Sequence, residues 1–277
     1  MKYKIISILF TILFLSSFTM EKKERITIFM IGDSTMANKS IEKENIERGW
    51  GQMLPYFLTD DVVVDNRAMN GRSSLSFINE GRWDAILAKL QKGDYVFIQF
   101  GHNDEKSAKE LHTEPGGTFD DNLRRFVREA RNKGAYPILF NSIVRRNFPP
   151  PGEIEHKGKY EKEGNVLVDT HGEYLESPRR VAKEMSVPFV DLNKLTHDLV
   201  TSMGVEKSKS LFMWVPAGKY EFCPKGRVDN THLNIYGGKV VANIAIKAVI
   251  KIVPALAPYV CHGELDIYTA DYKSDKY

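Results

Sequence analysis

The segment "IFMIGDSTMANKS" (residues 28–40) decides how the rest of the chain is interpreted. It begins like a buried strand, because Ile28 to Ile31 form a continuous apolar run, and it changes to small and polar residues at Gly32. Ser34 then has two interpretations. It can cap a helix after a strand-to-helix turn, or it can be a nucleophile presented by that turn. The segment alone does not decide between them, so the choice depends on the ends of the other strands.

Five short apolar runs recur along the chain, and segments of helical character separate them. The runs cover residues 26–31, 62–66, 95–100, 136–141 and 187–192. Continuous hydrophobic runs of this length are typical of strands buried on both faces of a parallel sheet. The expected helices cover residues 119–133, 177–186 and 235–253, with Ser177 as a cap and Pro178 at the first helical position. The alternation predicts one α/β domain, a doubly wound α/β/α sandwich with a five-stranded parallel sheet.

The N-terminus has the pattern of an export signal. A short basic stretch with Lys2 and Lys4 precedes an almost wholly apolar run over residues 5–18, and charged residues follow from Glu21. The run is short for a membrane span, although an uncleaved anchor is the alternative. We therefore expect a signal peptide at residues 1–20, one folded domain at 21–277, a periplasmic or secreted location, and no membrane association after cleavage.

Charge and cysteine content exclude some classes of protein. The chain has 277 residues and a formal charge of +3, which falls to +1 when residues 1–20 are removed. A nearly neutral protein gives no support to nucleic-acid binding. Cys223 and Cys261 could form one disulfide in an exported protein, whereas a metal site would need more ligands at closer spacing.

One long segment departs from the alternation of strands and helices. Residues 145–169 contain Pro149, Pro150 and Pro151 with many charges and little periodicity. Because the segment follows the fourth expected strand, we expect a loop that overhangs the carboxyl edge of the sheet, where ligands bind in such folds.

Three polar segments fall at the same expected edge as Ser34. They are "DNRAMNGRS" (65–73), "FGHND" (100–104) and "VDNTHLN" (228–234). His232 is the best candidate for a base that accepts the serine proton, and Asp229, three residues earlier, could fix its tautomer. Asp229 could also cap the turn before the last helix. Asn103, Gly71 and the backbone N–H of Ser34 could donate to an oxyanion, although Asn70-Gly71 could equally form an ordinary turn.

A second acid–histidine pair, Asp169 and His171, competes with the first. Its spacing differs, and no expected strand end presents it directly. We expect it to face the substrate or to anchor the long loop rather than to be the catalytic pair.

Together these blocks resemble the SGNH (GDSL-like) hydrolases. The resemblance rests on Gly32-Asp33-Ser34, Gly71, Asn103 and Asp229-x-x-His232, which occur in the family's order from residue 28 to 250. Finer features resemble the rhamnogalacturonan acetylesterases, namely Gly32–Thr35, Arg48–Gly51, Ala68–Ser73, Gln99–Asp104 and Asp229–His232. The resemblance implies a flavodoxin-like fold, no metal or organic cofactor, and removal of acetyl groups from pectic polysaccharide. It also implies that Ser34, His232 and Asp229 form the triad and that Ser34, Gly71 and Asn103 form the oxyanion hole.

The substrate and the competing functions stay open at this stage. The leading hypothesis is a carbohydrate acetylesterase, which we expect to be monomeric. The alternatives are a lipid esterase or thioesterase of the same superfamily, an acetylxylan esterase, and a glycan-binding protein without activity. Trp50 and Tyr174 could stack on sugar rings, and Arg72 and His171 could contact the substrate. A cluster of cations near the motifs would suit an acidic polymer, unless each cation pairs with a carboxylate on its own loop. The cluster comprises Arg48, Arg67, Arg72, Arg145, Arg146, Lys225 and Arg227.

Overall fold

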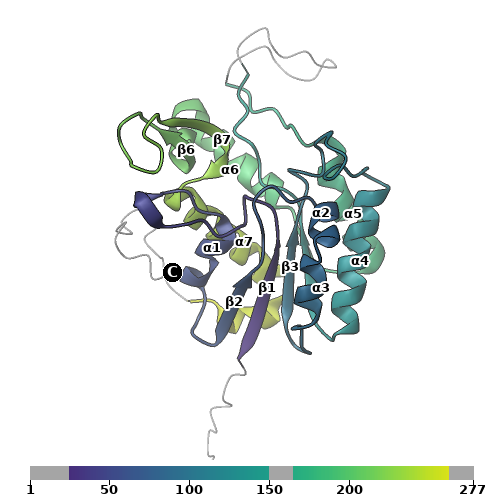
Figure 1. Ribbon diagram of the computed structural model, residues 1–277. Coiled ribbons are helices and arrows are strands. Elements are labelled where there is room, and N and C mark those ends of the chain that lie inside the picture. The colour runs from purple at the N-terminus through teal and green to yellow at the C-terminus, as the bar shows by residue number, and fades with distance from the viewer. Residues whose placement is uncertain (1–24, 150–164, 262–277) are drawn as a thin grey trace, which may run out of the picture.

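The computed structural model describes residues 25–149 and 165–261 (Figure 1). The expected signal peptide at residues 1–20 lies outside the described residues, as does most of the proline-containing segment. Residues at both ends of that segment are described, and they form hydrogen bonds with each other. The N–H of Val168 donates to the carbonyl of Asn147 at 2.9 Å, and the side chain of Asn147 donates back to the carbonyl of Val168 at 3.3 Å.

Five parallel strands form the central sheet. They are β1 (Ile26–Gly32), β2 (Val62–Asn66), β3 (Tyr95–Gln99), β4 (Tyr136–Phe140) and β5 (Phe189–Val190), in the order β2-β1-β3-β4-β5. This is the flavodoxin-like order, so the predicted fold is confirmed. In the register, Gly32 pairs with Gln99 and Met30 with Asn66. The carboxyl ends of β1, β2 and β3 therefore meet at one edge and bring their following loops together.

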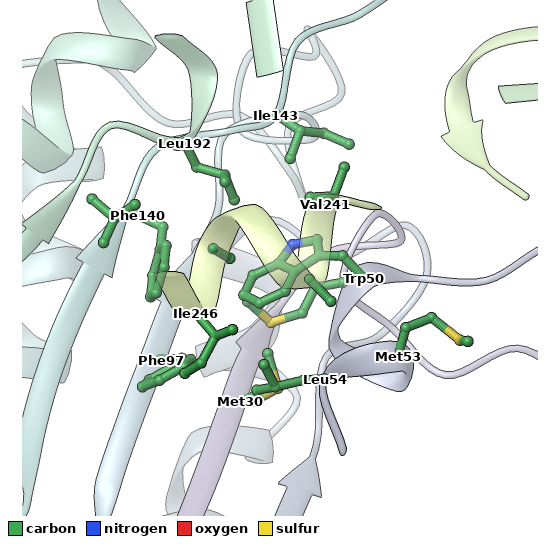
Figure 2. Close-up of a cluster of buried hydrophobic side chains, with 14 of the residues drawn as sticks. Met30, Trp50, Met53, Leu54, Phe97, Phe140, Ile143, Leu192, Val241 and Ile246 are labelled. Atoms are coloured by element: carbon green, nitrogen blue, oxygen red, sulfur yellow. The ribbon is translucent and has the colours of Figure 1, made fainter. Parts of the chain in front are cut away.

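Helices cover both faces of the sheet, which explains the continuous apolar runs. The helices α2 (Ser74–Asn79), α3 (Arg82–Leu87), α4 (Thr118–Asn132) and α5 (Glu176–Met185) pack on one face, and α1 (Trp50–Met53), α6 (Leu192–Lys207) and α7 (Ile235–Ile252) on the other. Side chains of β1 alternate between the two cores: Phe29 and Ile31 join the first, Ile28 and Met30 the second. Figure 2 shows the second core, where Trp50, Phe97 and Phe140 lie beside Val241 and Ile246 of α7.

The expected helices agree with the structure to within one or two residues, with one change of detail. The helix α5 begins at Glu176, because a 3₁₀ turn runs directly into it. Ser177 therefore lies in the first turn, where its hydroxyl accepts from Arg180, and it is not the cap that the sequence suggested. The 3₁₀ helices are η1 (Glu42–Glu44), η2 (Leu54–Phe57), η3 (Gly172–Leu175), η4 (Ser208–Leu211) and η5 (Pro254–Tyr259).

The last strand of the sheet is shorter than expected. The predicted run was 187–192, but β5 covers only Phe189 and Val190. The reason is that Asp191 caps α6, with its carboxylate accepting from the N–H of Lys194, so the helix begins where the apolar run still continues.

A small antiparallel ribbon was missed by the sequence analysis. The strands β6 (Phe212–Val215) and β7 (Arg227–Leu233) pair beside the main sheet (Figure 1). Asp229 and His232 lie on β7, not in a simple turn before the last helix. The polar residues of β7 hid the strand pattern. The pairing jumps from Phe212↔Leu233 to Met213↔Asp229, which leaves residues 230–232 without ladder partners.

Both described cysteines are free thiols, so the disulfide considered from the sequence is not formed. Each is held to a different segment. The residue before Cys223 donates its N–H to the carbonyl of Lys43, and Cys261 donates its N–H to the carbonyl of Phe57 at 2.9 Å. The structure was also searched for a membrane span. Over residues 25–149 and 165–261, no helix has the length and apolar character needed to cross a membrane.

Candidate active site

Ser34 lies in a tight turn that Asp33 stabilises. The Asp33 carbonyl accepts from the N–H groups of Met36 and Ala37, and its carboxylate accepts from the N–H and hydroxyl of Thr35 at 2.8 and 2.7 Å. Asp33 and Thr35 are buried, whereas Ser34 is partly exposed between them. The capping contacts of this turn belong to Asp33, and no helix follows before η1. The helix-cap interpretation of Ser34 therefore has no support in the structure.

A buried amide network lies beneath this turn. The Gln99 side chain, at the end of β3, donates to the hydroxyl of Thr35 at 3.0 Å and accepts from the indole N–H of Trp50 at 2.6 Å. Trp50 is 0% exposed. The expectation that it stacks on a sugar ring is therefore wrong, because its ring is part of the core and its N–H is used to orient Gln99.

Close packing of the Trp50 segment explains the neighbouring glycine. A Cβ atom on Gly49 would lie only 2.2 Å from the Ala37 carbonyl oxygen and 2.4 Å from the Met36 carbonyl carbon. The N–H of Trp50 donates to the carbonyl of Thr35 at 2.9 Å. Only glycine allows the α1 segment to approach the Ser34 turn this closely.

His232 connects Ser34 to Asp229. Its Nε2 lies 2.9 Å from the Ser34 Oγ, and its Nδ1 lies 2.8 Å from the Asp229 Oδ2. The other carboxylate oxygen of Asp229 accepts from the N–H groups of Thr231 and His232 at 2.7 and 2.9 Å. Because these backbone bonds fix the carboxylate, they also fix the orientation of the ring it holds.

The charge on Asp229 is stabilised although the residue is largely buried. Burial by itself would raise the pKa of this carboxyl. The hydrogen bonds from the His232 ring and from the N–H groups of His232 and Thr231 outweigh that effect, and they hold its pKa well below the usual value. Arg227 also donates to Asp229 Oδ2, from Nη2 at 2.5 Å. Asp229 is therefore ionised throughout the neutral pH range.

The expected oxyanion donors meet at the same edge of the sheet. Gly71 occupies a turn closed by the Arg72 N–H and the Met69 carbonyl, and its φ of 75° is one that glycine adopts without strain. Space within 4 Å of a Cβ at Gly71 is empty. The Asn103 amide donates to the Arg72 carbonyl at 3.0 Å. That bond uses one N–H of the amide and ties the Asn103 loop to the Gly71 turn.

Asp104 fixes the loop that carries Asn103. Its fully buried carboxylate accepts from the N–H of Gly101 at 3.1 Å, from the N–H of Ser74 at 3.0 Å and from the hydroxyl of Thr113 at 3.0 Å. These bonds join the start of α2 to the loop after β3. Asp104 is thus a structural residue of the "FGHND" segment.

The second acid–histidine pair lies in a different place and does not reach Ser34. His171 Nδ1 is 3.4 Å from the Asp169 Oδ1, and its Nε2 is 2.9 Å from the Nδ1 of His102. The His171 side chain is 0% exposed. The expectation that it faces the substrate is therefore wrong. It anchors the root of the long segment to the loop that carries Asn103.

Burial also keeps the partner of His171 neutral. The interior position of His102, with His171 and the Arg145 guanidinium nearby, holds its pKa well below the usual value. Its Nε2 has no hydrogen-bond partner within the described ranges. His102 is thus a neutral, buried histidine at a contact between two loops.

The other two side chains that were predicted to contact the substrate, Tyr174 and Arg72, form contacts within the protein. Tyr174 packs its ring against Phe119, with centroids 5.5 Å apart, and its hydroxyl donates to the carbonyl of Thr113. Its predicted stacking on sugar is therefore not supported. Arg72 is partly exposed, but its guanidinium pairs with Glu80 at 3.1 Å. Its contact with substrate stays a prediction.

Four of the arginines near the motifs also have carboxylate partners. The pairs are Arg67–Asp65, Arg72–Glu80, Arg145–Glu105 and Arg227 with both Glu47 and Asp229. Arg146 is buried and bonds to Ser208 and Asn230. This pairing is the alternative that the sequence left open. The four paired arginines therefore give no argument for an acidic polymer.

Several residues of the site were missed. Gln99 had a weak signal, a polar side chain in an otherwise apolar run. Lys39 and Glu47 had none, because nothing in their local sequence indicates that they meet Arg227 and Asn70. Within residues 25–149 and 165–261, no three His, Cys, Asp or Glu side chains are grouped so that they could hold a metal ion.

A serine, a histidine and a carboxylate joined in this order form the arrangement of a serine hydrolase. Here they lie at the carboxyl edge of a flavodoxin-like sheet. The sequence profile of the GDSL-like Lipase/Acylhydrolase family matches residues 30–212. The chain belongs to this family, and by that membership it is a carboxylic ester hydrolase. The matched range contains Ser34, Gly71 and Asn103 and ends before β7.

Individual relatives agree with the family assignment. The chain is 37% identical over 227 residues to rhamnogalacturonan acetylesterase RhgT of Bacillus subtilis, an alignment that covers 82% of this chain and 90% of RhgT. It is 30% identical over 243 residues to a rhamnogalacturonan acetylesterase of Emericella nidulans, covering 81% and 84%. A crystal structure of the Bacillus subtilis protein YxiM superposes with a TM-score of 0.64 at 27% identity, covering 83% of this chain and 57% of that one.

Proposed function

We propose that the protein is an exported serine esterase that removes O-acetyl groups from a plant cell-wall polysaccharide of the rhamnogalacturonan type. The observation that carries the esterase chemistry is the 2.9 Å contact between Ser34 Oγ and His232 Nε2, with Asp229 on the other ring nitrogen. The substrate class rests on the relatives from Bacillus subtilis and Emericella nidulans, which are named rhamnogalacturonan acetylesterases.

In the proposed reaction, Ser34 Oγ attacks the carbonyl carbon of the acetyl ester while His232 Nε2 accepts its proton. The negative oxygen of the tetrahedral intermediate receives hydrogen bonds from the N–H groups of Ser34 and Gly71 and from the free N–H of Asn103. The intermediate collapses to an acetyl-enzyme, and His232 returns the proton to the departing sugar oxygen. Water, deprotonated by His232, then releases acetate and restores the serine.

The surroundings of His232 suit this proton transfer. Asp229 accepts from Nδ1 and so leaves Nε2 as the acceptor that faces Ser34. The carboxylate also stabilises the imidazolium formed during attack. Because its own pKa is depressed, it stays ionised and does not take the proton itself.

Export is part of the same proposal. It is supported by the basic start and the apolar run of residues 1–18. The mass of the protein recovered outside the cytoplasm should correspond to a chain that has lost about the first 20 residues, by analogy with the usual signal length. Recovery of the full-length chain in the membrane fraction would instead indicate an anchor.

The decisive experiment measures acetate release from acetylated rhamnogalacturonan and acetylated xylan at equal acetyl concentration. We expect faster release from rhamnogalacturonan, and no detectable release by Ser34→Ala. Ser40→Ala is the matched control, because Ser40 is an exposed serine on the same loop. Faster hydrolysis of a long-chain p-nitrophenyl ester than of the acetate would favour a lipid esterase. Faster release from xylan would favour an acetylxylan esterase.

A further inference from the structure

A chain of charged side chains runs from the triad carboxylate to the turn that carries Gly71. Arg227 Nη2 lies 2.5 Å from Asp229 Oδ2, and Arg227 Nη1 lies 2.5 Å from Glu47 Oε2. The other Glu47 oxygen is 2.9 Å from Lys39 Nζ, which in turn donates to Asn70 Oδ1 at 2.5 Å. The charges alternate in sign, so each carboxylate lies between two donors.

Lys39 is the member of this series whose charge is most deeply buried. Its side chain is only 4% exposed, and that of Glu47 is 14% exposed. Burial lowers the pKa of Lys39, and the nearby Glu47 carboxylate offsets part of that effect. A buried ion pair is often no more stabilising than apolar residues of the same size. A contribution to stability therefore gives little reason for an ammonium group at this position.

The backbone around Lys39 does not need that ammonium group either. The Gln52 side chain accepts from the Lys39 N–H at 2.9 Å and donates to the Lys39 carbonyl at 3.1 Å. These two bonds hold the loop after Ser34 in place. The charged end of Lys39 is then free to act on a different segment.

That segment is the Gly71 turn. Its backbone is also held by the Met69 N–H, which donates to the Gly32 carbonyl at 3.0 Å, and by the Arg72 guanidinium, which donates to the Asn70 carbonyl at 2.9 Å. These bonds and the Asn103 bond to the Arg72 carbonyl reach main-chain atoms, whereas the Lys39 bond reaches the Asn70 side chain. Asn70 and Gly71 are exposed, and the bond that closes the turn, from the Arg72 N–H to the Met69 carbonyl, is long at 3.3 Å. The Lys39 contact holds the Asn70 side chain from the buried side. It thereby fixes the residue that immediately precedes the expected oxyanion donor.

The opposite end of this series of charged side chains contacts His232. Asp229 Oδ2, the oxygen that meets Arg227, is also the oxygen that meets His232 Nδ1. Glu47 has a second connection, because it forms a backbone bridge with Asn234, two residues after His232. The series of charged side chains therefore contacts both the triad and the Gly71 turn.

We propose that Lys39 is a positioning residue for the esterase reaction: through Asn70 on one side, and through Glu47 and Arg227 on the other, it keeps the Gly71 donor in register with the Asp229–His232 pair. The inference rests on the proposed function, since it assumes that the Gly71 N–H receives the oxyanion. Lys39 itself touches neither Ser34 nor His232 in the contacts described above.

The test compares Lys39→Met with Asn70→Ala on p-nitrophenyl acetate. Each variant should lower kcat by about 10- to 100-fold, less than the loss of a whole oxyanion donor, with KM changed by less than about threefold. Lys39→Met removes one partner of the buried Glu47 carboxylate and should also lower the melting temperature, so kcat is measured well below the melting temperature of each variant. Because both changes act on one turn, the double variant should be no slower than the slower single variant.

Arg180→Met is the matched control. Arg180 pairs with the fully buried carboxylate of Asp120 between α4 and α5, away from the site. This variant should lower the melting temperature and leave kcat unchanged. A Lys39→Met protein that behaves in the same way would overturn the proposal, and so would multiplicative losses in the double variant. If Lys39→Met does not fold, the exposed Asn70 still allows the test through Asn70→Ala, whose unchanged kcat would contradict the proposal.

A second measurement separates this proposal from the proposed function. Amide hydrogen exchange of residues 70–72 should accelerate in Lys39→Met while the exchange of the β3 amides stays as in the wild type. This readout needs no turnover. Unchanged exchange at the turn would refute the positioning role even in an active enzyme. Absence of ester hydrolysis by the wild type, with the expected exchange, would refute only the proposed function.

Discussion

Two aspartate–histidine pairs lie at the carboxyl edge of the same sheet, and their surroundings differ. In the pair Asp229–His232, the ring is held at 2.8 Å and its second nitrogen meets Ser34. In the pair Asp169–His171, the carboxylate is 3.4 Å away and the second nitrogen meets another histidine. The His232 side chain is 26% exposed, while that of His171 is 0% exposed. Residue types alone therefore do not define a catalytic pair; the partner of the second ring nitrogen does.

The largest effect should separate the two histidines. His232→Ala removes the proposed base, and loss of such a residue from a serine triad costs on the order of 10⁶-fold in kcat. His171→Ala removes a loop contact, and we expect kcat within about tenfold of the wild type because the triad is left intact. Hydrolysis of p-nitrophenyl acetate measures both. A larger loss from His171→Ala would reverse the assignment of the two pairs.

The two carboxylates should differ by a smaller but still large factor. Asp229→Asn favours the wrong tautomer of His232 and should lower kcat by about 10⁴-fold. Asp169→Asn should change kcat by less than about tenfold, since its histidine does not exchange a proton with the substrate. Steady-state kinetics on the same ester give both values. Equal losses in the two variants would show that the pairs are coupled and not independent.

Variants in the loop that carries Asn103 and His102 should give an intermediate loss of kcat. Asn103→Ala removes a proposed oxyanion donor, and the loss of such a donor costs about 10²- to 10³-fold in kcat. Its neighbour His102 belongs to the structural pair, so His102→Ala should cost much less at saturating substrate. The two kcat values are the measurement. If His102→Ala were the more harmful change, the His102–His171 contact would be part of the catalytic machinery.

The smallest effect concerns stability against pH. The pKa of Asp229 is lowered in the folded protein, so the unfolded chain binds more protons as the pH falls through its unfolded pKa, near 4. The stabilisation from Asp229 is thus present above pH 4 and is lost as the pH falls further. The gap in melting temperature between wild type and Asp229→Asn should shrink below pH 4, and it should exceed the corresponding gap for Asp169→Asn at pH 7. A gap that widens in acid would contradict this sign.

The sequence was sufficient for the parts of the site that lie in local motifs. The five apolar runs predicted the strands, because both faces of this sheet are buried. The Ser34 and Asn103 segments were found at strand ends, and the His232 segment was found before the last helix. Exposure could not be predicted in this way. Trp50 was expected to stack on sugar, but it is buried against Gln99, since close packing of the α1 segment decides where its ring points.

Local sequence patterns also could not predict contacts between segments that are far apart in the sequence. Lys39, Glu47 and Arg227 meet only because the loop after β1 and the strand β7 approach each other in the fold. The strand β7 was missed because its polar residues serve the site and break the usual alternation. Functional demands obscured the secondary-structure signal at the place where the triad is built.

The central claim is that His232, and not His171, activates Ser34. Its most direct test is covalent labelling with a fluorophosphonate, followed by mass spectrometry of the adduct in wild type, His232→Ala and His171→Ala. Our account predicts one adduct per chain, on Ser34, in the wild type and in His171→Ala, and its loss in His232→Ala. An adduct on another residue, or labelling of Ser34 that survives in His232→Ala but disappears in His171→Ala, would contradict it.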